Sequence, residues 1–278
     1  MKIIGLQLDA VWHDKAANHA RVRRLLEAAP PEPGSLVILP EMFSTGFSMD
    51  VAAVTEGVDR LSERFLGSIA AQYGVGVLGG VVRPAPDGRG RNQAVLFGRD
   101  GSEAARYQKI HPFRYAGETE YYEPGGPVCL FDWGGFTTAP FICYDLRFPE
   151  DFRRAVSRGA QLFIVIANWP TARLAHWTTL LKARAIENQA YVVGVNRCGS
   201  DPNVDYPGHS LVIDPRGEIL VEAGSQECSF TADLDLEALL SYRRVFPALE
   251  DMERGGVRVE GWRDGWMEGK SGCWVLSV

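Results

Sequence analysis

The chain has 278 residues, of which 46% are hydrophobic and 23% charged, as in ordinary soluble globular proteins. This composition argues against a disordered, collagen-like or coiled-coil protein. The 29 basic and 35 acidic residues give a formal net charge of −6 and form no basic block, so we expect neither nucleic acid nor a membrane surface as a partner. A chain of this length can bury a core without a disulfide or a metal staple.

The five cysteines predict free thiols in a reducing compartment. Their number is odd, and their spacing matches neither a zinc site nor a small disulfide framework. The longest apolar runs are about six residues, whereas a membrane-spanning helix needs roughly 18. The first residues lack the apolar core and the cleavage site of a signal peptide. We therefore expect a cytoplasmic protein.

Helix and strand patterns alternate along the chain and predict one α/β domain. Asp14 is the predicted N-cap of the first helix, and Gly74 is the predicted end of the second. In chain order, the sequence predicts a strand at 2–9, a helix at 14–28, a strand at 35–39, a helix at 59–73, strands at 76–82, 92–97 and 136–143, a helix at 151–158, a strand at 161–167, a helix at 176–189, and strands at 191–196, 211–214 and 219–222.

The expected domain covers residues 1–254. From Gly255 onward the sequence is rich in Gly, Trp and charged residues and has no clean periodicity. We therefore expect residues 255–278 to form a separate tail, either loosely ordered or acting as an arm in a dimer.

Two glycine-rich segments do not predict a nucleotide site. Residues 74–79 fit the spacing of a dinucleotide-binding loop, but here the first glycine ends a predicted helix and the others lie in a strand. Residues 269–271 resemble the end of a phosphate loop, but the upstream glycine is too close and no strand precedes it. The five histidines form no i, i+4 pair. We expect neither a cofactor nor a metal.

Three residues with reactive side chains stand out from the pattern. Glu41 directly follows a hydrophobic strand, Lys109 lies between an apolar run and a proline, and Cys143 ends a buried strand before a turn and a helix. Taken singly, their ordinary explanations are a solvated loop glutamate, a surface lysine and a core cysteine. However, a strand–cysteine–turn–helix sequence also has the geometry that pushes a nucleophile out of a sheet.

Taken together, Glu41, Lys109 and Cys143 resemble the nitrilase, or carbon–nitrogen hydrolase, superfamily, over about residues 1–250. Further marks are CYDLRFPE at 143–150, ANWP at 167–170 and RAIENQ at 184–189. EMFSTGFSM at 41–49 and NWP at 168–170 are most similar to bacterial YafV-type omega-amidases. The resemblance implies a four-layer α-β-β-α sandwich, usually a homodimer, that uses no cofactor. The tail departs from the usual ending of the family.

The resemblance also implies a role for each residue. Cys143 would attack the amide carbon and form a thioester, and Glu41 would carry protons between the reacting groups. Lys109 and the backbone N–H of Tyr144 would stabilise the oxyanion, and the ammonium would favour the thiolate. A second glutamate holds the lysine in this family. Glu118 fits its spacing, and Glu120 is the alternative.

An omega-amidase releases ammonia from short 2-oxo acid amides, namely 2-oxoglutaramate and 2-oxosuccinamate. Such a substrate keeps a free carboxylate, so its pocket needs a cation. Arg173, Arg147 and Arg114 are candidates, although for Arg147 we expect an ion pair with Asp145 or Glu150.

Three aromatic residues are expected in the pocket wall, with core packing as the alternative: Phe43, Tyr121 and Trp169. The expected partner is a small-molecule amide. Other possible functions are a related amidase acting on deaminated glutathione or an N-carbamoyl amine, a true nitrilase, and a non-catalytic binding protein on the same fold.

Overall fold

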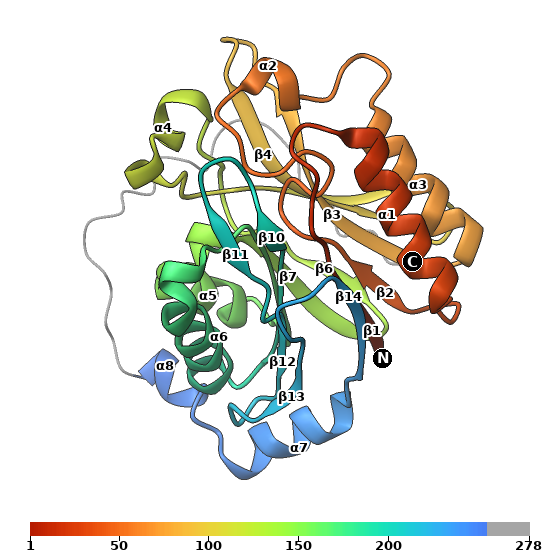
Figure 1. The fold of residues 1–278 in the computed structure, drawn as a ribbon. Helices are drawn as coiled ribbons and strands as arrows, with labels where there is room; N and C mark the ends of the chain where they lie inside the picture. Colours follow the sequence, from red (N-terminus) through yellow and green to blue (C-terminus); the bar gives the residue numbers. More distant parts are fainter. Residues whose placement is uncertain (255–278) are drawn as a thin grey trace.

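Two β-sheets packed face to face, with helices on both outer faces, make up the computed structural model, which describes residues 1–254 (Figure 1). In this part of the chain each large sheet has six strands, and β10 and β11 form a separate pair. The four-layer α-β-β-α sandwich confirms the predicted fold. No helix among these residues is both long and apolar enough to cross a membrane.

The first sheet has the order β14-β1-β2-β3-β4-β5, with β1 (Lys2–Gln7), β2 (Leu36–Ile38), β3 (Gly76–Pro84), β4 (Gly90–Phe97), β5 (Glu103–Gln108) and β14 (Cys228–Asp233). The second has the order β13-β12-β9-β8-β7-β6, with β6 (Phe131–Trp133), β7 (Phe136–Ile142), β8 (Leu162–Ala167), β9 (Tyr191–Asn196), β12 (Leu211–Ile213) and β13 (Ile219–Glu222). The separate pair is β10 (Cys198–Ser200) and β11 (Asp205–Pro207).

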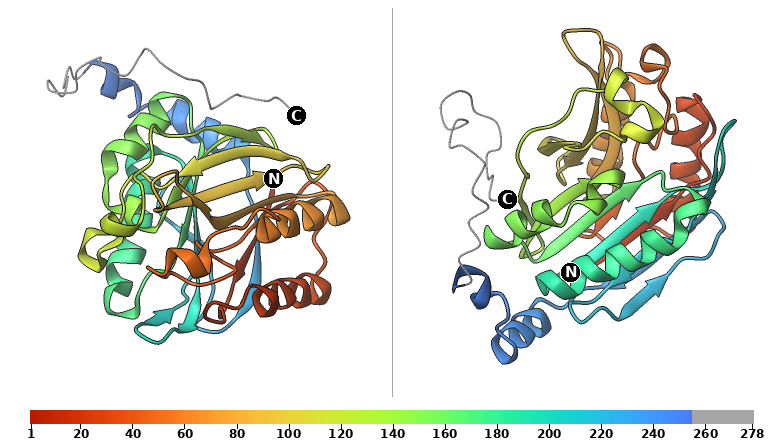
Figure 2. Two further views of the ribbon diagram at one scale, coloured as in Figure 1. Left: turned by 90° about the horizontal axis from the view of Figure 1, so that it is seen from above. Right: turned by 90° about the vertical axis from the view of Figure 1, so that its left-hand side faces the viewer.

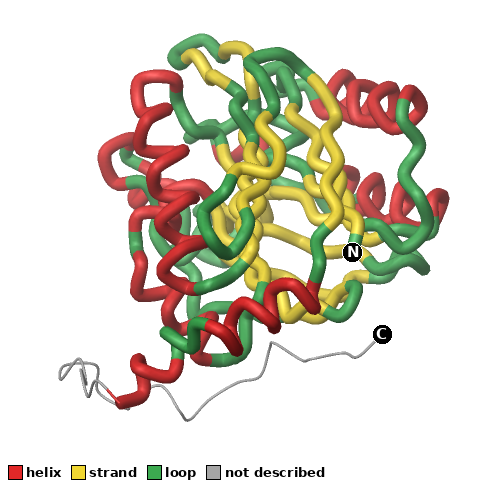
Figure 3. The backbone as a smooth tube through the Cα atoms, turned by 90° about the horizontal axis from the view of Figure 1, so that it is seen from below, coloured by secondary structure: helices red, strands yellow, loops and turns green. Residues whose placement is uncertain are grey.

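The α-helices are α1 (Lys15–Ala28), α2 (Val51–Val54), α3 (Leu61–Tyr73), α4 (Glu118–Tyr121), α5 (Pro149–Ser157), α6 (Leu174–Asn188), α7 (Leu236–Val245) and α8 (Glu250–Arg254). Three 3₁₀ turns are η1 (Arg114–Ala116), η2 (Cys143–Arg147) and η3 (Thr171–Arg173). Helices α1 and α3 cover the first sheet, and α5 and α6 cover the second (Figure 2). The strands thus run through the middle of the molecule between two helical layers (Figure 3).

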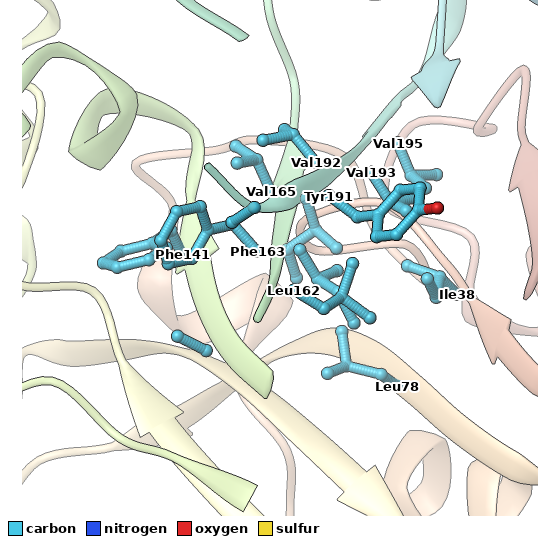
Figure 4. Close-up of a cluster of buried hydrophobic side chains, with 14 of the residues drawn as sticks. Ile38, Leu78, Phe141, Leu162, Phe163, Val165, Tyr191, Val192, Val193 and Val195 are labelled. Atoms are coloured by element: carbon cyan, nitrogen blue, oxygen red, sulfur yellow. The ribbon is translucent and has the colours of Figure 1, made fainter. Parts of the chain in front are cut away.

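The main core lies between the two sheets. Alternate residues of a strand face opposite sides, so Ile38 of β2 packs in the core between the sheets, whereas Val37 packs with α1 and α3. Figure 4 shows Ile38 and Leu78 of the first sheet opposite side chains of the second, such as Leu162 and Val193. Both faces of these strands are buried, which explains their continuous apolar sequences.

The predicted caps are confirmed. The Asp14 side chain accepts a hydrogen bond from the backbone of Ala17 at 2.9 Å, and Gly74 ends α3 with φ +64°. Gly76 and Gly79 lie in β3, as expected of a strand rather than a nucleotide loop. A Cβ on Gly79 would lie 3.1 Å from the side chain of Leu66, so this glycine allows close packing of helix on sheet.

Every predicted helix and strand corresponds to an element of the structure, with ends displaced by a few residues. The strands that the sequence did not predict, β5, β6, β10, β11 and β14, lie at sheet edges or in the small pair. Edge strands contact one neighbour and carry polar residues, so their pattern is weak. The expected tail at 255–278 and the glycine segment at 269–271 lie outside the described residues.

Candidate active site

Glu41 lies at the carboxyl end of β2, in a loop that packs tightly against β3. A Cβ on Gly80 would lie 2.5 Å from the Cα of Glu41, so only glycine allows this approach. The carboxylate is 1% exposed. Its Oε1 accepts hydrogen bonds from Asn92 Nδ2 at 2.7 Å and Lys109 Nζ at 3.0 Å, and its Oε2 accepts one from the backbone of Asn168 at 2.9 Å. Four donors on rigid elements therefore fix its orientation, the fourth being Asn168 Nδ2 at 3.2 Å.

Lys109 directly follows β5, and its buried ammonium lies between two carboxylates. Nζ is 3.0 Å from Glu41 Oε1 and 2.8 Å from Glu118 Oε2. Burial lowers the pKa of Lys109, but the charges of Glu118 and Glu41 outweigh it and raise this pKa well above its ordinary value. The lysine is therefore a permanent cation in a site without bulk water.

Glu118, at the start of α4, is the second carboxylate that holds Lys109. It is fully buried and also accepts hydrogen bonds from Asn92 Nδ2 at 3.1 Å and from the backbone of Phe113. Glu120 is exposed on the surface. Of the two glutamates, Glu118 is the one that contacts the lysine.

Cys143 follows β7 as the first residue of η2, and its φ of +47° lies in the left-handed region. This conformation costs a non-glycine residue about 1–2 kcal/mol, so the surrounding contacts must hold it. Cys143 as a whole residue is partly exposed, and its thiol donates a weak hydrogen bond to Asn168 O at 3.9 Å. The turn therefore presents the sulfur beyond the end of the sheet.

The Lys109 ammonium lowers the pKa of the Cys143 thiol, as expected, but two other effects outweigh it. Burial raises the pKa of this thiol, Glu41 raises it further, and the opposing effect of Lys109 is too small to compensate. The pKa therefore lies well above its ordinary value. The thiol is protonated at rest and needs a base to take its proton.

A cavity of about 300 Å³ opens in front of Cys143 and Lys109. Its aromatic wall residues are Phe47, Phe113, Tyr115, Tyr144, Trp169 and Tyr206. Tyr144 and Trp169 thus lie where the sequence placed them. Arg147 and Arg173 are the cations of the wall besides Lys109 among the described residues.

A family model described as carbon-nitrogen hydrolase matches residues 3–244. The chain belongs to this family. It is 41% identical over 260 residues to an omega-amidase YafV from Yersinia enterocolitica, covering 91% of this chain and 97% of the relative. It is 32% identical over 252 residues to a 2-oxoglutaramate amidase from Bacillus subtilis, covering 90% and 96%.

Two solved carbon–nitrogen hydrolase structures are similar to this one. A superfamily protein from Xanthomonas campestris with an arsenic adduct in its active site has a TM-score of 0.84 and 36% identity, covering 90% of this chain and 96% of that one. An amidase from Nesterenkonia sp. AN1, in which acrylamide has added to the active-site cysteine, has a TM-score of 0.76 and 27% identity, covering 92% and 99%.

Two aromatic predictions for the substrate pocket of this carbon–nitrogen hydrolase are wrong. Phe43 is 1% exposed and packs between α1, α3 and the first sheet, with its ring 5.7 Å from that of His19. The loop after β2 turns Glu41 toward the site and Phe43 into the helical side. Tyr121 is 44% exposed and lies outside the cavity, since α4 turns Glu118 inward and leaves Tyr121 on the surface.

The prediction that Arg147 forms an ion pair with Asp145 or Glu150 is also wrong. Its guanidinium lies 4.8 Å from the ring of Trp169 and 3.2 Å from His176 Nδ1, and it pairs with no carboxylate of the described residues. Asp145 instead points into the protein, where Tyr107 donates to it at 2.7 Å. Arg147 is therefore available to the cavity.

Of the other candidate arginines, Arg173 lines the cavity and Arg114 does not. The Arg173 guanidinium lies 5.6 Å from the ring of Phe113 and 5.2 Å from that of Tyr115. It too pairs with no carboxylate among the described residues. Arg114, in η1, is exposed and outside the cavity.

Two asparagines at the site escaped prediction. Asn92, near the start of β4, donates through one nitrogen to both Glu41 and Glu118. Asn168 donates through its side chain to Glu41 O at 2.8 Å as well as to the carboxylate. The available signal was a buried-strand sequence, NQAVLF, that begins with an asparagine where an apolar residue would be ordinary.

Proposed function

We propose that this carbon–nitrogen hydrolase is an omega-amidase. It hydrolyses short 2-oxo acid amides, such as 2-oxoglutaramate and 2-oxosuccinamate, to a 2-oxo dicarboxylate and ammonia. The observation that carries the proposal is the pair of arginines, Arg147 and Arg173, in a largely apolar cavity in front of Cys143. The names of the relatives from Yersinia and Bacillus support the same substrate class.

In the first half of the reaction Glu41 takes the proton of Cys143 as the sulfur attacks the amide carbon. Lys109 and the backbone N–H of Tyr144 stabilise the negative charge on the carbonyl oxygen. Glu41 then gives its proton to the amide nitrogen, the C–N bond breaks, and ammonia leaves. The acyl group remains on Cys143 as a thioester.

In the second half water replaces ammonia. Glu41 removes a proton from water, and the resulting hydroxide attacks the thioester carbon. The C–S bond breaks, the proton returns to the sulfur, and the carboxylic acid leaves. Glu118 takes no proton in this scheme: it keeps Lys109 charged and aimed at the oxyanion.

The substrate carboxylate would bind at the two arginines. A guanidinium binds a carboxylate through two parallel hydrogen bonds, and an arginine that pairs with no carboxylate among the described residues is free to do so. The aromatic walls of Trp169 and Tyr144 would cover the short carbon chain between the two ends of the substrate.

The test is ammonia release from 2-oxoglutaramate, with glutamine and a simple nitrile alongside. Turnover of the 2-oxo amide with little turnover of the others supports the proposal. Replacing Arg147 by Met should raise the KM for 2-oxoglutaramate by about 10–100-fold, the loss expected for a charged hydrogen bond, and should affect a neutral amide far less. Arg114→Met, outside the cavity, is the matched control. Equal losses on charged and neutral amides would contradict the carboxylate site.

We also propose that the protein is a cytoplasmic homodimer whose two subunits contact each other through a helical face. The end of α6 is tied to α7 by a hydrogen bond from Gln189 Nε2 to Phe246 O at 2.7 Å. Ile186, Val245 and Phe246 are exposed in this region, and burial of such residues favours association. Analytical ultracentrifugation of the whole chain tests this, and a monomer at micromolar concentration would contradict it.

A further inference from the structure

Asp145, two residues after Cys143, joins the segment of the lysine to the segment of the cysteine. Its side chain is completely buried. Oδ2 accepts hydrogen bonds from the hydroxyl of Tyr107 at 2.7 Å and the backbone of Ile142 at 3.0 Å. Oδ1 accepts one from the backbone of His111 at 2.9 Å. Two of these donors, Tyr107 and His111, lie two residues before and two residues after Lys109 in the sequence. The third, Ile142, directly precedes Cys143.

We propose that Asp145 is a positioning residue that fixes the distance and orientation of Lys109 relative to Cys143. The two side chains come from different sheets, since Lys109 follows β5 and Cys143 follows β7. One carboxylate with bonds to both segments prevents either from moving independently.

The chemistry of the partners explains why the residue is a carboxylate. All three are hydrogen-bond donors, and an ionised carboxylate is a pure acceptor. An asparagine of the same shape would offer one acceptor oxygen and would place its NH₂ group against a donor. It would therefore lose the hydrogen bonds to at least one of the two segments.

The backbone strain at Cys143 gives the same residue a second task. With its φ of +47°, Cys143 persists in the left-handed region only where its surroundings enforce that conformation. The bond from Ile142 to Asp145 closes the turn around the cysteine. Tyr144 lies in the same turn. Loss of the hydrogen bond from Ile142 to Asp145 would therefore disturb both the nucleophile and the N–H that is proposed as an oxyanion donor.

The test compares two conservative variants. Tyr107→Phe removes the hydroxyl donor to Asp145, and Tyr191→Phe removes a comparable interior hydroxyl, which donates to Asp235 O at 3.2 Å, far from the site. We expect Tyr107→Phe to lower kcat for 2-oxoglutaramate about tenfold with KM changed less than about threefold, because misplaced groups reduce the rate rather than binding. Tyr191→Phe should leave kcat unchanged.

Asp145→Asn extends the comparison. It should lower kcat by about 10–100-fold, and the double variant with Tyr107→Phe should lose little more, because both changes break one link. If Asp145→Asn fails to fold, Tyr107→Phe against Tyr191→Phe decides the question alone.

A second readout does not depend on the substrate, because the kinetic test rests on the proposed function. The rate at which iodoacetamide alkylates Cys143, followed by peptide mass spectrometry, should fall several-fold in Tyr107→Phe and not in Tyr191→Phe. Failure of wild-type protein to hydrolyse 2-oxoglutaramate would overturn the function and leave this measurement intact. The role of Asp145 would be overturned if Tyr107→Phe had unchanged kcat and an unchanged alkylation rate while the two Phe variants were equally stable to heat.

Discussion

The two sheets supply different parts of the site. The first sheet and its loops supply Glu41, Asn92, Lys109 and Glu118, each at most 1% exposed. The second supplies the partly exposed Cys143 and most of the cavity wall. The carboxylates of Glu41 and Glu118 are therefore buried and do not line the cavity, whereas Lys109 and Cys143 reach it. This arrangement strengthens each electrostatic interaction, because the surroundings screen it weakly.

The largest expected effect comes from the second sheet. Cys143→Ala should abolish ammonia release, by at least about 10⁴-fold, since no other cysteine among the described residues lines the cavity. The protein should stay folded, because the smaller side chain removes one sulfur from a partly exposed residue and no buried ion pair. Activity and thermal unfolding measured on the same preparation check this.

Cys198→Ala is the matched control for the loss of a thiol. Cys198 is buried and free, but it lies at the start of β10, outside the cavity wall. This variant should lose stability and keep its activity per folded molecule. A folded Cys143→Ala protein that still releases ammonia would refute the proposed nucleophile.

A smaller effect is expected from the first sheet. Asn92→Ala removes one donor shared by Glu41 and Glu118, and a hydrogen bond to a charged group contributes about 1.5–3 kcal/mol. We expect kcat to fall about 10–100-fold with little change in KM, because Asn92 lies behind the reacting groups and does not line the cavity.

Asn18→Ala provides the comparison for Asn92→Ala. Asn18 is equally buried and donates to Val11 O and Ser44 O at 2.8 Å, on the outer side of the first sheet. Its loss should reduce stability without changing kcat. Similar kinetic losses in both variants would mean that Asn92 acts through general stability.

The sequence made the reactive residues at strand ends easier to predict than an amide within a strand. Glu41 and Cys143 each interrupt an apolar pattern at its end, where a reactive side chain is conspicuous. Asn92 starts the apolar part of a strand and is conspicuous only once Glu41 and Glu118 are seen to converge on it.

Side-chain direction in loops was the other limit. Phe43 lies two residues from Glu41, yet Met42, with φ +43°, turns the chain between them and sends the ring into the helical layer. Asp145 and Glu150 lie close to Arg147 in sequence, but the 3₁₀ turn η2 directs Asp145 inward and Arg147 toward the cavity. Such directions depend on backbone dihedrals that a residue pattern does not contain.

The smallest expected effect compares Lys109 with His19, a partly buried basic residue on the same side of the molecule. His19, on α1, lies flat against the ring of Phe65 at 4.1 Å. Burial lowers its pKa from 6.5 to about 4, and the nearby charge of Glu56 does not compensate. Lys109 keeps its charge because two carboxylates touch it, whereas His19 stays neutral because no carboxylate among the described residues does.

This difference predicts a pH-dependent stability. Between pH 6.5 and 4 the unfolded chain binds a proton at His19 that the folded protein does not bind, so the free energy of unfolding should fall as the pH falls through this window. We expect about 1–2 kcal/mol after allowance for partial exposure. His19→Phe keeps the stacking and removes the titration, so urea unfolding of wild type should lose this amount relative to the variant from pH 7 to 4. If the free energies of unfolding of the two proteins fall in parallel from pH 7 to 4, His19 takes up its proton in the folded protein as well. Burial without a carboxylate partner would then not be enough to neutralise a basic group in this layer.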